Sequence, residues 1–417
     1  MDYIQLLERR IAVIGGGPIG LEAALYARTL GAEVRVYEAG AVAQSVSEWG
    51  HIELFTPFGM NHTRLGRQVL EAADHQLPAD DAFQTGAEWR ESYLLPLAER
   101  TELADCIVNG ARVVTVGRDS LLKDDHIGDG VRAQLPFRLF IERDGAERYE
   151  QADIVLDCSG SWGNPNWLGT GGTPALGERE ARGRIAYHPV DVLGSEARYA
   201  GRRTLLVGGG LSAATTAVAL AELAAKAAGT RCLWITRAAG PVPVAAIPDD
   251  TLVRRAALTE AANRLATGAD GAVSWMPATT VRTVRWVGDD ERFAVALATP
   301  DGVRKERFDE VIANVGYEPD DGLYRQLQIH ECYASRAPMK LAASLLAASA
   351  EAGGDCLQLG GFGPDVLVNP EPGFFILGMK SYGRSSAFLL RTGYEQIRDA
   401  FRLLTGRADL DLYAGAD

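Results

Sequence analysis

Residues 10 to 38 read RIAVIGGGPIGLEAALYARTLGAEVRVYE, and this stretch decides the fold. Its apolar run from Ile11 to Ile14 is typical of a buried parallel strand, and the glycines after it have the spacing G-x-G-x-x-G. We expect a helix from about Pro18 to Leu30 and a second strand from Val34 to Tyr37. The order of strand, turn, helix and strand predicts a β-α-β unit whose turn can receive a phosphate.

Each glycine of this turn has its own physical task. Gly15 permits the tight turn, Gly17 lets a pyrophosphate approach the backbone, and Gly20 lets the helix pack closely on the strand. The helix begins at Pro18 and directs its unpaired N–H groups and positive dipole end at the phosphates. Glu38 follows the second strand, where a carboxylate can accept hydrogen bonds from ribose hydroxyls. These features predict a dinucleotide site, and the alternative is a purely structural glycine turn.

The bulk composition is that of a soluble globular protein. The chain has 417 residues, enough for two domains, with 47% hydrophobic and 23% charged residues. A net charge of −13 argues against binding to nucleic acid or to an anionic membrane, because both need a basic face. We find no apolar run long enough to span a bilayer and no signal peptide in MDYIQLLERR, so we expect a cytoplasmic protein.

The cysteines are odd in number and widely spaced, without a C-x-x-C pair. This argues against a disulfide framework, a zinc site or a local redox disulfide, and small buried side chains are the simpler interpretation. The five cysteines are Cys106, Cys158, Cys232, Cys332 and Cys356.

The opening pattern recurs in the middle of the chain. We expect a strand from Arg203 to Val207, then G-x-G-x-x-A, then an alanine-rich helix from Ser212 to Ala228. The next strand, Cys232 to Ile235, is followed by Thr236 and Arg237 where an NAD site often carries an acid. Because an arginine can pair with a ribose phosphate, Arg237 favours NADPH over NADH; the alternative is a solvated surface charge. The candidate cofactor-binding residues of this second turn are Gly208, Gly210, Ser212 and Ala213.

Two apolar strands end in glycine and mark the crossings between domains. The first runs from Asp153 to Leu156 and leads to Gly160, and the second runs from Glu310 to Val315 and leads to Gly316. A small residue at a strand end lets the chain pass close to a bound cofactor. We therefore expect a first domain over residues 1–165, a second over 185–316, and a return segment over 317–417.

The return segment contains a further strand, glycine, polar loop and helix. Gly373 to Leu377 is the expected strand, Gly378 follows it, and the last helix runs from about Ser385 to Leu404. If this segment returns to the first domain, Lys380 and Arg384 lie near the bound dinucleotide. If that dinucleotide carries a redox-active ring, a cation there suits the negative charge of the reduced ring. The alternative is that both residues cap the neighbouring loop.

The other expected elements complete an α/β pattern. The region after Glu38 is irregular and contains Trp49, which either approaches the redox ring or packs between elements. The strands expected at residues 281–287, 293–297 and 303–308 predict a meander that covers one face of the second sheet. Expected helices are residues 94–100, 253–267 and 341–352, and expected strands are residues 112–117, 137–143, 281–287, 293–297 and 303–308.

The whole constellation resembles the flavoproteins with two dinucleotide-binding domains, which include flavin-containing monooxygenases, Baeyer–Villiger monooxygenases and pyridine nucleotide disulfide reductases. The resemblance implies an α/β fold of two Rossmann-like domains, one for FAD and one for NADPH. It also implies that the NADPH domain is inserted into a discontinuous FAD domain. The residues that carry it are Gly15, Gly17, Gly20 and Glu38, then Gly208, Gly210 and Ala213, then Gly160, Gly316 and Gly378.

Two branches of this superfamily differ in their motifs. The disulfide reductases need a cysteine pair beside the flavin, and no pair with that spacing occurs here. The monooxygenases commonly carry F-x-G-x-x-x-H before the second glycine motif, and residues 181 to 188 read ARGRIAYH, without the phenylalanine and with His188 one residue late. His188 is therefore a candidate functional residue, and a packed or exposed histidine is the alternative.

By this resemblance the leading hypothesis is an FAD-dependent monooxygenase that takes hydride from NADPH and oxygenates an amine, a sulfide or a similar small molecule with dioxygen through a flavin hydroperoxide. The alternatives are an NADPH-driven flavin reductase, a substrate-oxidising flavin dehydrogenase or oxidase, and a redox-sensing flavoprotein. The candidate catalytic residues are Lys380, Arg384 and His188. A monomer and a homo-oligomer are both open.

Overall fold

The computed structural model describes residues 8–268, 271–351, 357 and 361–414. It consists of two compact units, unit 1 being Met1–Asn164 with Glu318–Asp417 and unit 2 being Pro165–Tyr317. Unit 2 begins well before residue 185 because Leu168 and Ala175 are already part of its hydrophobic core. Ala352 and Cys356 lie outside the described residues.

Unit 1 contains a five-stranded parallel sheet in the order β15-β7-β1-β2-β3. Its central strand β1 has the burial pattern of a strand covered on both faces, as its apolar run predicts. Strand β15 belongs to the return segment and pairs with β7, so the chain comes back to this sheet after unit 2. The strands are β1 (Arg10–Ile14), β2 (Glu33–Tyr37), β3 (Ile107–Val108), β7 (Ile154–Asp157) and β15 (Phe374–Ile376).

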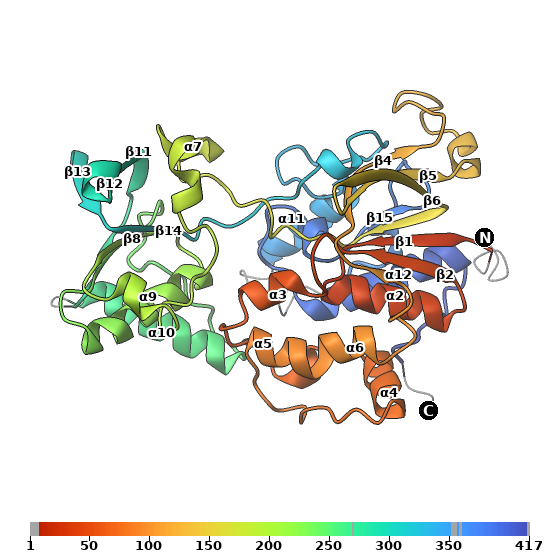
Figure 1. The fold of residues 1–417 in the computed structure, drawn as a ribbon, viewed down its shortest axis with the longest axis horizontal. Coiled ribbons are helices and arrows are strands. Elements are labelled where there is room, and N and C mark those ends of the chain that lie inside the picture. The colour runs from red at the N-terminus through yellow and green to blue at the C-terminus, as the bar shows by residue number, and fades with distance from the viewer. Residues whose placement is uncertain (1–7, 269–270, 352–356, 358–360, 415–417) are drawn as a thin grey trace. The chain divides into compact units, whose positions relative to one another are not determined.

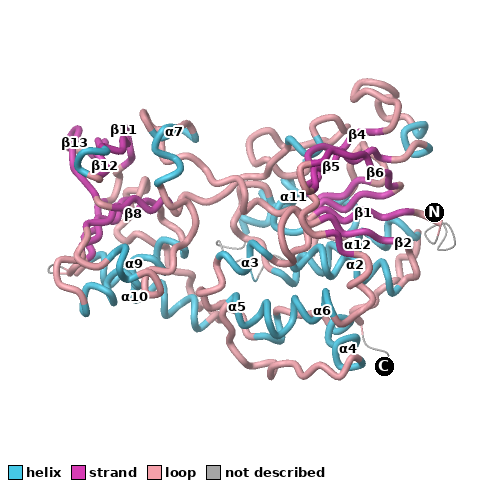
Figure 2. The backbone as a smooth tube through the Cα atoms, viewed as in Figure 1, coloured by secondary structure: helices cyan, strands magenta, loops and turns pink. Residues whose placement is uncertain are grey.

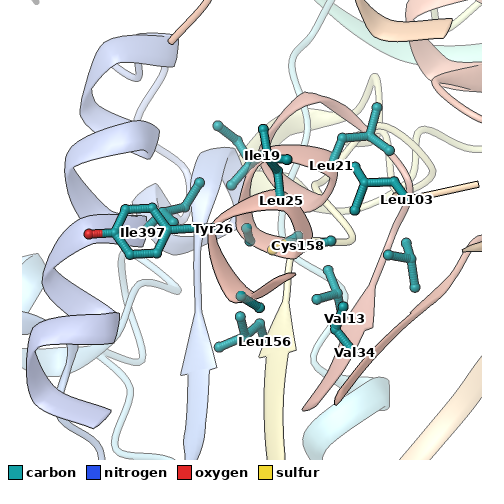
Figure 3. Close-up of a cluster of buried hydrophobic side chains, with 14 of the residues drawn as sticks. Val13, Ile19, Leu21, Leu25, Tyr26, Val34, Leu103, Leu156, Cys158 and Ile397 are labelled. Atoms are coloured by element: carbon teal, nitrogen blue, oxygen red, sulfur yellow. The ribbon is translucent and has the colours of Figure 1, made fainter. Parts of the chain in front are cut away.

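Helices α2 (Pro18–Thr29) and α12 (Leu390–Thr405) lie on one side of this sheet (Figure 1). Residues Ile19 to Ala27 of α2 are all buried, because the helix is packed between the strands and α12. Figure 3 shows Ile19, Leu25 and Tyr26 of α2 together with Ile397 of α12. The Tyr26 ring also stacks on the Phe401 ring of α12, with the two ring centroids 4.9 Å apart. This close packing holds the start of α2 at the end of β1.

A three-stranded antiparallel sheet covers the other side of the parallel sheet in unit 1 (Figure 1). Its strands form a meander, and their inward side chains build a second hydrophobic core with β1 and β7. Its strands are β4 (Arg112–Arg118), β5 (Phe137–Arg143) and β6 (Ala146–Ala152). The other α-helices in the described part of unit 1 are α3 (Gln44–Glu48), α4 (Arg64–Ala72), α5 (Gly86–Trp89), α6 (Leu95–Glu99) and α11 (Met339–Glu351).

Unit 2 repeats this plan with a four-stranded parallel sheet in the order β10-β9-β8-β14. Helices α9 and α10 lie on one side of the sheet and the meander β11-β12-β13 on the other (Figure 2). The strands are β8 (Arg203–Val207), β9 (Arg231–Ile235), β10 (Val273–Met276), β11 (Thr280–Val287), β12 (Arg292–Thr299), β13 (Gly302–Phe308) and β14 (Glu310–Ala313). The helices are α7 (Glu178–Ala181), α8 (Glu196–Tyr199), α9 (Leu211–Lys226) and α10 (Val253–Thr267).

The elements that were expected agree with these bounds within a few residues, except at the start of the last helix. The elements absent from the expectation are the helices α3, α4, α5, α7 and α8 and the strands β3, β6 and β10. The polar AERYEQA sequence of β6 shows no apolar alternation because most of its residues are exposed. The last helix begins at Leu390 instead of Ser385. There Phe388 packs edge-on against Tyr382, with the ring centroids 5.4 Å apart, and the backbone at Leu389 is extended.

Within the described part of the chain, no helix combines the length and the apolar character needed to cross a membrane.

Candidate functional site

The first glycine turn lies at the carboxyl edge of the unit 1 sheet. All five strands are parallel, so the residues after β1, β2, β7 and β15 meet at this edge. The Gly15 N–H donates to Tyr37 O at 2.8 Å, and the Cys158 N–H donates to Ile14 O at 2.9 Å. The predicted residues that the structure brings to this edge are Gly15, Gly17, Pro18, Gly20, Glu38, Gly160, Gly378 and Lys380.

The surroundings of the three glycines show which of them are required for close packing and which one leaves space for a ligand. Gly15 has a φ of +101°, and a Cβ there would lie 2.7 Å from Cys158 O. A Cβ on Gly20 would lie 1.9 Å from Gly15 O, so the close approach of α2 to the turn requires a glycine at that position. A Cβ on Gly17 would meet no atom within 4 Å. Space is thus open at the N-terminus of α2, where the orphan N–H groups and the helix dipole favour an anion.

The Glu38 carboxylate braces this turn. Its Oε2 accepts the Gly16 N–H at 2.6 Å and its Oε1 accepts the Gly40 N–H at 2.8 Å. A carboxylate has about four acceptor positions. Each Glu38 oxygen therefore retains an acceptor position for a further hydrogen bond.

The second glycine turn has the same construction in unit 2. Gly208 has a φ of +143°, and a Cβ there would lie 2.1 Å from Asn314 O, whereas a Cβ on Gly210 would meet no atom within 4 Å. The Trp234 indole N–H donates to Gly208 O at 2.7 Å and holds the turn. Ala213 is fully buried in α9, in the place that Gly20 has in α2.

Arg237 lies two residues beyond β9 and is exposed. Because β9 is parallel to β8, Arg237 and the Gly208–Gly210 turn are at the same edge of the unit 2 sheet. Ser212 lies in the first turn of α9, and Gly316 follows β14 at the same edge.

Lys380 is buried against the carboxylate of Asp157, a residue that was not among the predicted site residues. Its Nζ lies 2.7 Å from Asp157 Oδ2, and the side chains of Lys380 and Asp157 are 1% and 0% exposed. The Ser159 hydroxyl donates to Asp157 Oδ1 at 2.6 Å, and Lys380 Nζ donates to the Ser159 oxygen at 3.0 Å. The ammonium also lies 5.0 Å from the centroid of the Tyr324 ring. Lys380 thereby ties the end of β15 to the end of β7.

The other cationic candidate has different surroundings. Arg384 forms an ion pair with Glu318, and its side chain is 48% exposed. Its backbone N–H donates to Ser335 O at 2.9 Å. Within the described part of the chain, Lys380 and Arg384 therefore share no hydrogen-bond partner, although only three residues lie between them in the sequence.

His188 and Trp49 each have a specific contact. In unit 2, the His188 Nδ1 lies 3.0 Å from the Tyr317 hydroxyl oxygen, and the two rings are stacked with their centroids 5.5 Å apart. In unit 1, Trp49 packs on the backbone of Gly86, where a Cβ would lie 2.4 Å from the indole ring. A side chain at position 86 would collide with the indole ring, so the glycine at that position is what permits the contact with Trp49.

Comparisons with known proteins support the overall fold. The model of the family described as pyridine nucleotide-disulphide oxidoreductase matches residues 3–50. No curated protein matches the chain. Bacillithiol disulfide reductase Bdr (YpdA) from Bacillus cereus is similar in structure, with a TM-score of 0.65 and 17% identity over 96% of this chain and 99% of that one.

Two monooxygenases are similar over the same extent. DfoA from Erwinia amylovora, a cadaverine monooxygenase solved with FAD, has a TM-score of 0.63 and 16% identity over 95% of this chain and 94% of that one. The flavin-containing monooxygenase from Stenotrophomonas maltophilia has a TM-score of 0.55 and 19% identity over 95% of this chain and 98% of that one. The fold is that of the flavoproteins with two dinucleotide-binding domains.

Within this flavoprotein fold the described cysteines are poorly suited to thiol chemistry. No disulfide joins any two of the four cysteines that the structure describes. Burial raises the pKa of the thiols of Cys106, Cys158 and Cys232, so these three stay protonated at neutral pH. Hydrogen bonds from Ser335 and Ala334 lower the pKa of Cys332, which has no cysteine partner among the described residues. The described residues also contain no group of three or more His, Cys, Asp or Glu side chains suited to a metal.

Proposed function

We propose that this chain is an FAD-dependent oxidoreductase that takes hydride from NADPH and, as a monooxygenase, transfers one oxygen atom of dioxygen to a small molecule while the other oxygen atom, with the hydride and a proton, leaves as water. The observation that carries the proposal is the pair of glycine turns at the carboxyl edges of two parallel sheets, each with open space at its middle glycine. When bound, FAD supplies the two-electron chemistry that no protein side chain provides.

In unit 1 the proposed task of the residues is to bind and orient FAD. The Gly15–Gly17 turn and the α2 N-terminus, with Pro18 as the first helical residue, receive the diphosphate. Glu38 accepts hydrogen bonds from the ribose. The backbone at Gly160 and Gly378 provides the small strand ends along which the cofactor lies, and Trp49 closes the loop after β2.

In unit 2 the proposed task is to bind NADPH. The diphosphate approaches the backbone at Gly210 and Ser212, where the helix dipole of α9 favours it. Arg237 pairs with the 2′-phosphate, because it follows β9 at the carboxyl edge of the sheet, is exposed, and has no ion-pair partner among the described residues. This contact distinguishes NADPH from NADH.

The three polar candidates receive different proposed roles. Lys380 acts through Asp157 and Ser159: it holds the chain that leads to Gly160, and the net charge of the buried pair is zero. Arg384 is the cation available to a reduced ring or to a substrate carboxylate, because its side chain is half exposed. His188, through its contact with Tyr317, positions the backbone at Gly316.

Oxygen transfer is favoured over thiol reduction by the state of the cysteines. A flavoprotein that reduces disulfides through its own thiols needs a reactive thiolate with a partner, whereas three of the four described thiols are buried and protonated. A monooxygenase needs no protein nucleophile. The alternative, an NADPH oxidoreductase without oxygen insertion, has the same two cofactor sites and is separated by experiment.

The test is reduction of the purified FAD-loaded protein by NADPH without air, followed by admission of ¹⁸O₂ with a panel of primary amines and thioethers. We expect NADPH to bleach the flavin absorbance and one panel member to gain one ¹⁸O atom per NADPH consumed. Bleaching with hydrogen peroxide as the only oxygen product would support the oxidoreductase without oxygen insertion. A flavin that neither NADPH nor NADH bleaches would overturn the role of unit 2.

A further inference from the structure

Asn314 lies where the second glycine turn meets the end of β14. It directly follows Ala313, the last residue of that strand, and its carbonyl oxygen is the atom that a Cβ on Gly208 would meet at 2.1 Å. The Asn314 Cβ would lie 3.4 Å from that same point. The side chain of Asn314 therefore starts at the turn itself, beside the α9 N-terminus.

Among the described residues, only the oxygen of the Asn314 side-chain amide has a hydrogen-bond partner. Thr216, in the second turn of α9, has its Oγ1 3.0 Å from Asn314 Oδ1 and 3.0 Å from Ser212 O, and its one hydroxyl hydrogen is shared between these two acceptors. Asn314 is 8% exposed, and its Nδ2 is buried without a hydrogen-bond partner among the described residues. Buried amide groups in proteins are almost always hydrogen-bonded, because an unmet donor loses its water without compensation. An unmet donor beside a ligand site can take its acceptor from the ligand.

We propose that Asn314 Nδ2 donates a hydrogen bond to an oxygen of the dinucleotide bound at the Gly208–Gly210 turn, and that Thr216 is the positioning residue that orients the amide. The contact with Thr216 occupies Oδ1 and leaves the two N–H groups of the amide for the ligand. This inference rests on the proposed binding of NADPH to unit 2. It adds a side-chain contact to a site otherwise built from backbone N–H groups and Arg237.

The experiment measures the affinity of the FAD-loaded full chain for NADP⁺ by calorimetry. In N314A we expect the Kd for NADP⁺ to rise about tenfold, which corresponds to ~1.4 kcal/mol. T216V should raise the Kd by a smaller factor, and T216S, which keeps the hydroxyl, should restore it. FAD content and the unfolding temperature without NADP⁺ are measured for every variant.

A matched control exists in the same sheet. Thr204 of β8 is fully buried and its Oγ1 likewise has no partner among the described residues, but it lies at the opposite end of the strand from the turn. T204V should therefore bind NADP⁺ with the wild-type Kd. This control separates an effect of the glycine turn from a general effect of removing a buried hydroxyl or amide.

The outcomes are distinguishable. Binding of NADP⁺ to N314A with the wild-type Kd would overturn the inference and leave the proposed function intact. If N314A loses FAD or fails to fold, the comparison of T216V with T216S decides, and equal affinities in those two variants would overturn the inference. Failure of the wild-type protein itself to bind NADP⁺ or NAD⁺ would overturn both the inference and the nicotinamide site of unit 2.

Discussion

At the scale of the residue, Glu22 is a buried carboxylate without a cationic partner among the hydrogen bonds and ion pairs of the described residues. It is fully buried in α2, accepts the Thr63 hydroxyl at Oε2 over 2.8 Å, and accepts the Tyr93 hydroxyl at Oε1. Burial raises the pKa of Glu22 to about 7, although both hydrogen bonds act in the opposite direction. Its neutral form is therefore the one that the folded protein prefers in mildly acidic solution.

This raised pKa predicts a pH-dependent stability. The folded-state pKa lies above the ordinary value of 4.5, so the contribution of Glu22 is complete below pH 4.5 and is lost as the pH rises to about 7. Between pH 5 and pH 8 we expect the wild-type free energy of unfolding to fall by roughly 2–3 kcal/mol more than that of E22Q, which stays neutral. Urea unfolding of both proteins at the two pH values measures it. Parallel pH profiles would contradict the raised pKa.

Arg237 carries the second prediction at this scale. R237A should raise the KM for NADPH by about tenfold or more, ~1.4 kcal/mol, and leave the KM for NADH nearly unchanged, because only NADPH has the 2′-phosphate. Arg202 is an exposed arginine just before β8, at the other edge of the same sheet, and R202A serves as the control. Equal changes for both nucleotides in R237A would remove Arg237 from this role.

At the scale of the element, the turn between β1 and α2 contains two glycines with different tasks. A Cβ at Gly17 meets no atom within 4 Å, whereas a Cβ at Gly20 would lie 1.9 Å from a backbone oxygen. We expect G17V to fold with a near wild-type unfolding temperature in the flavin-free state but to be purified without FAD, because the valine fills the phosphate space. G20A should lose about 1–3 kcal/mol of stability, since helix and turn must move apart.

Flavin absorbance and thermal unfolding of the two apoproteins check this pair. A fully flavinated G17V would contradict the FAD site, and a G20A protein as stable as the wild type would contradict the close contact of α2 with the turn.

At the scale of the whole molecule, a buried ionic network joins segments of unit 1 that are far apart in the sequence. Glu371, just before β15, accepts hydrogen bonds from Arg118 of β4 at 2.8 Å and from Arg132 at 2.7 Å. The three side chains are at most 1% exposed. The two arginines hold the pKa of Glu371 below its usual value against the effect of burial, so the carboxylate is charged. The return segment is thereby attached to the meander.

Breaking this network should be costly. E371Q leaves two buried guanidinium groups without a counter-charge, and we expect a loss of about 3–5 kcal/mol in the free energy of unfolding. The exposed pair Lys226–Glu222 on α9 is the control, and K226A should have no measurable effect. Chemical denaturation of the three proteins measures both changes. An E371Q protein as stable as the wild type would show that the arginines find other partners.

Much of the fold follows from local sequence. The strands β5 and β8 and the helix α10 have the predicted bounds, because apolar runs and glycine punctuation are local signals. Strand β6 escaped prediction because an exposed strand has no apolar period to read. The glycine turns were predictable for the same reason as the strands: each needs specific residue types at short, fixed distances.

The sequence by itself therefore determined the two β-α-β units, the order of their strands along the chain, and the glycines and Glu38 at the turns. Only the tertiary structure decided that β15 pairs with β7, that Lys380 is neutralised by Asp157, and that Asn314 presents an unmet donor beside Gly208. The physical reason is the distance along the chain over which each interaction acts. Backbone conformation and amphipathic period depend on neighbours a few residues apart, whereas burial and ion pairing depend on segments that meet only when the chain has folded.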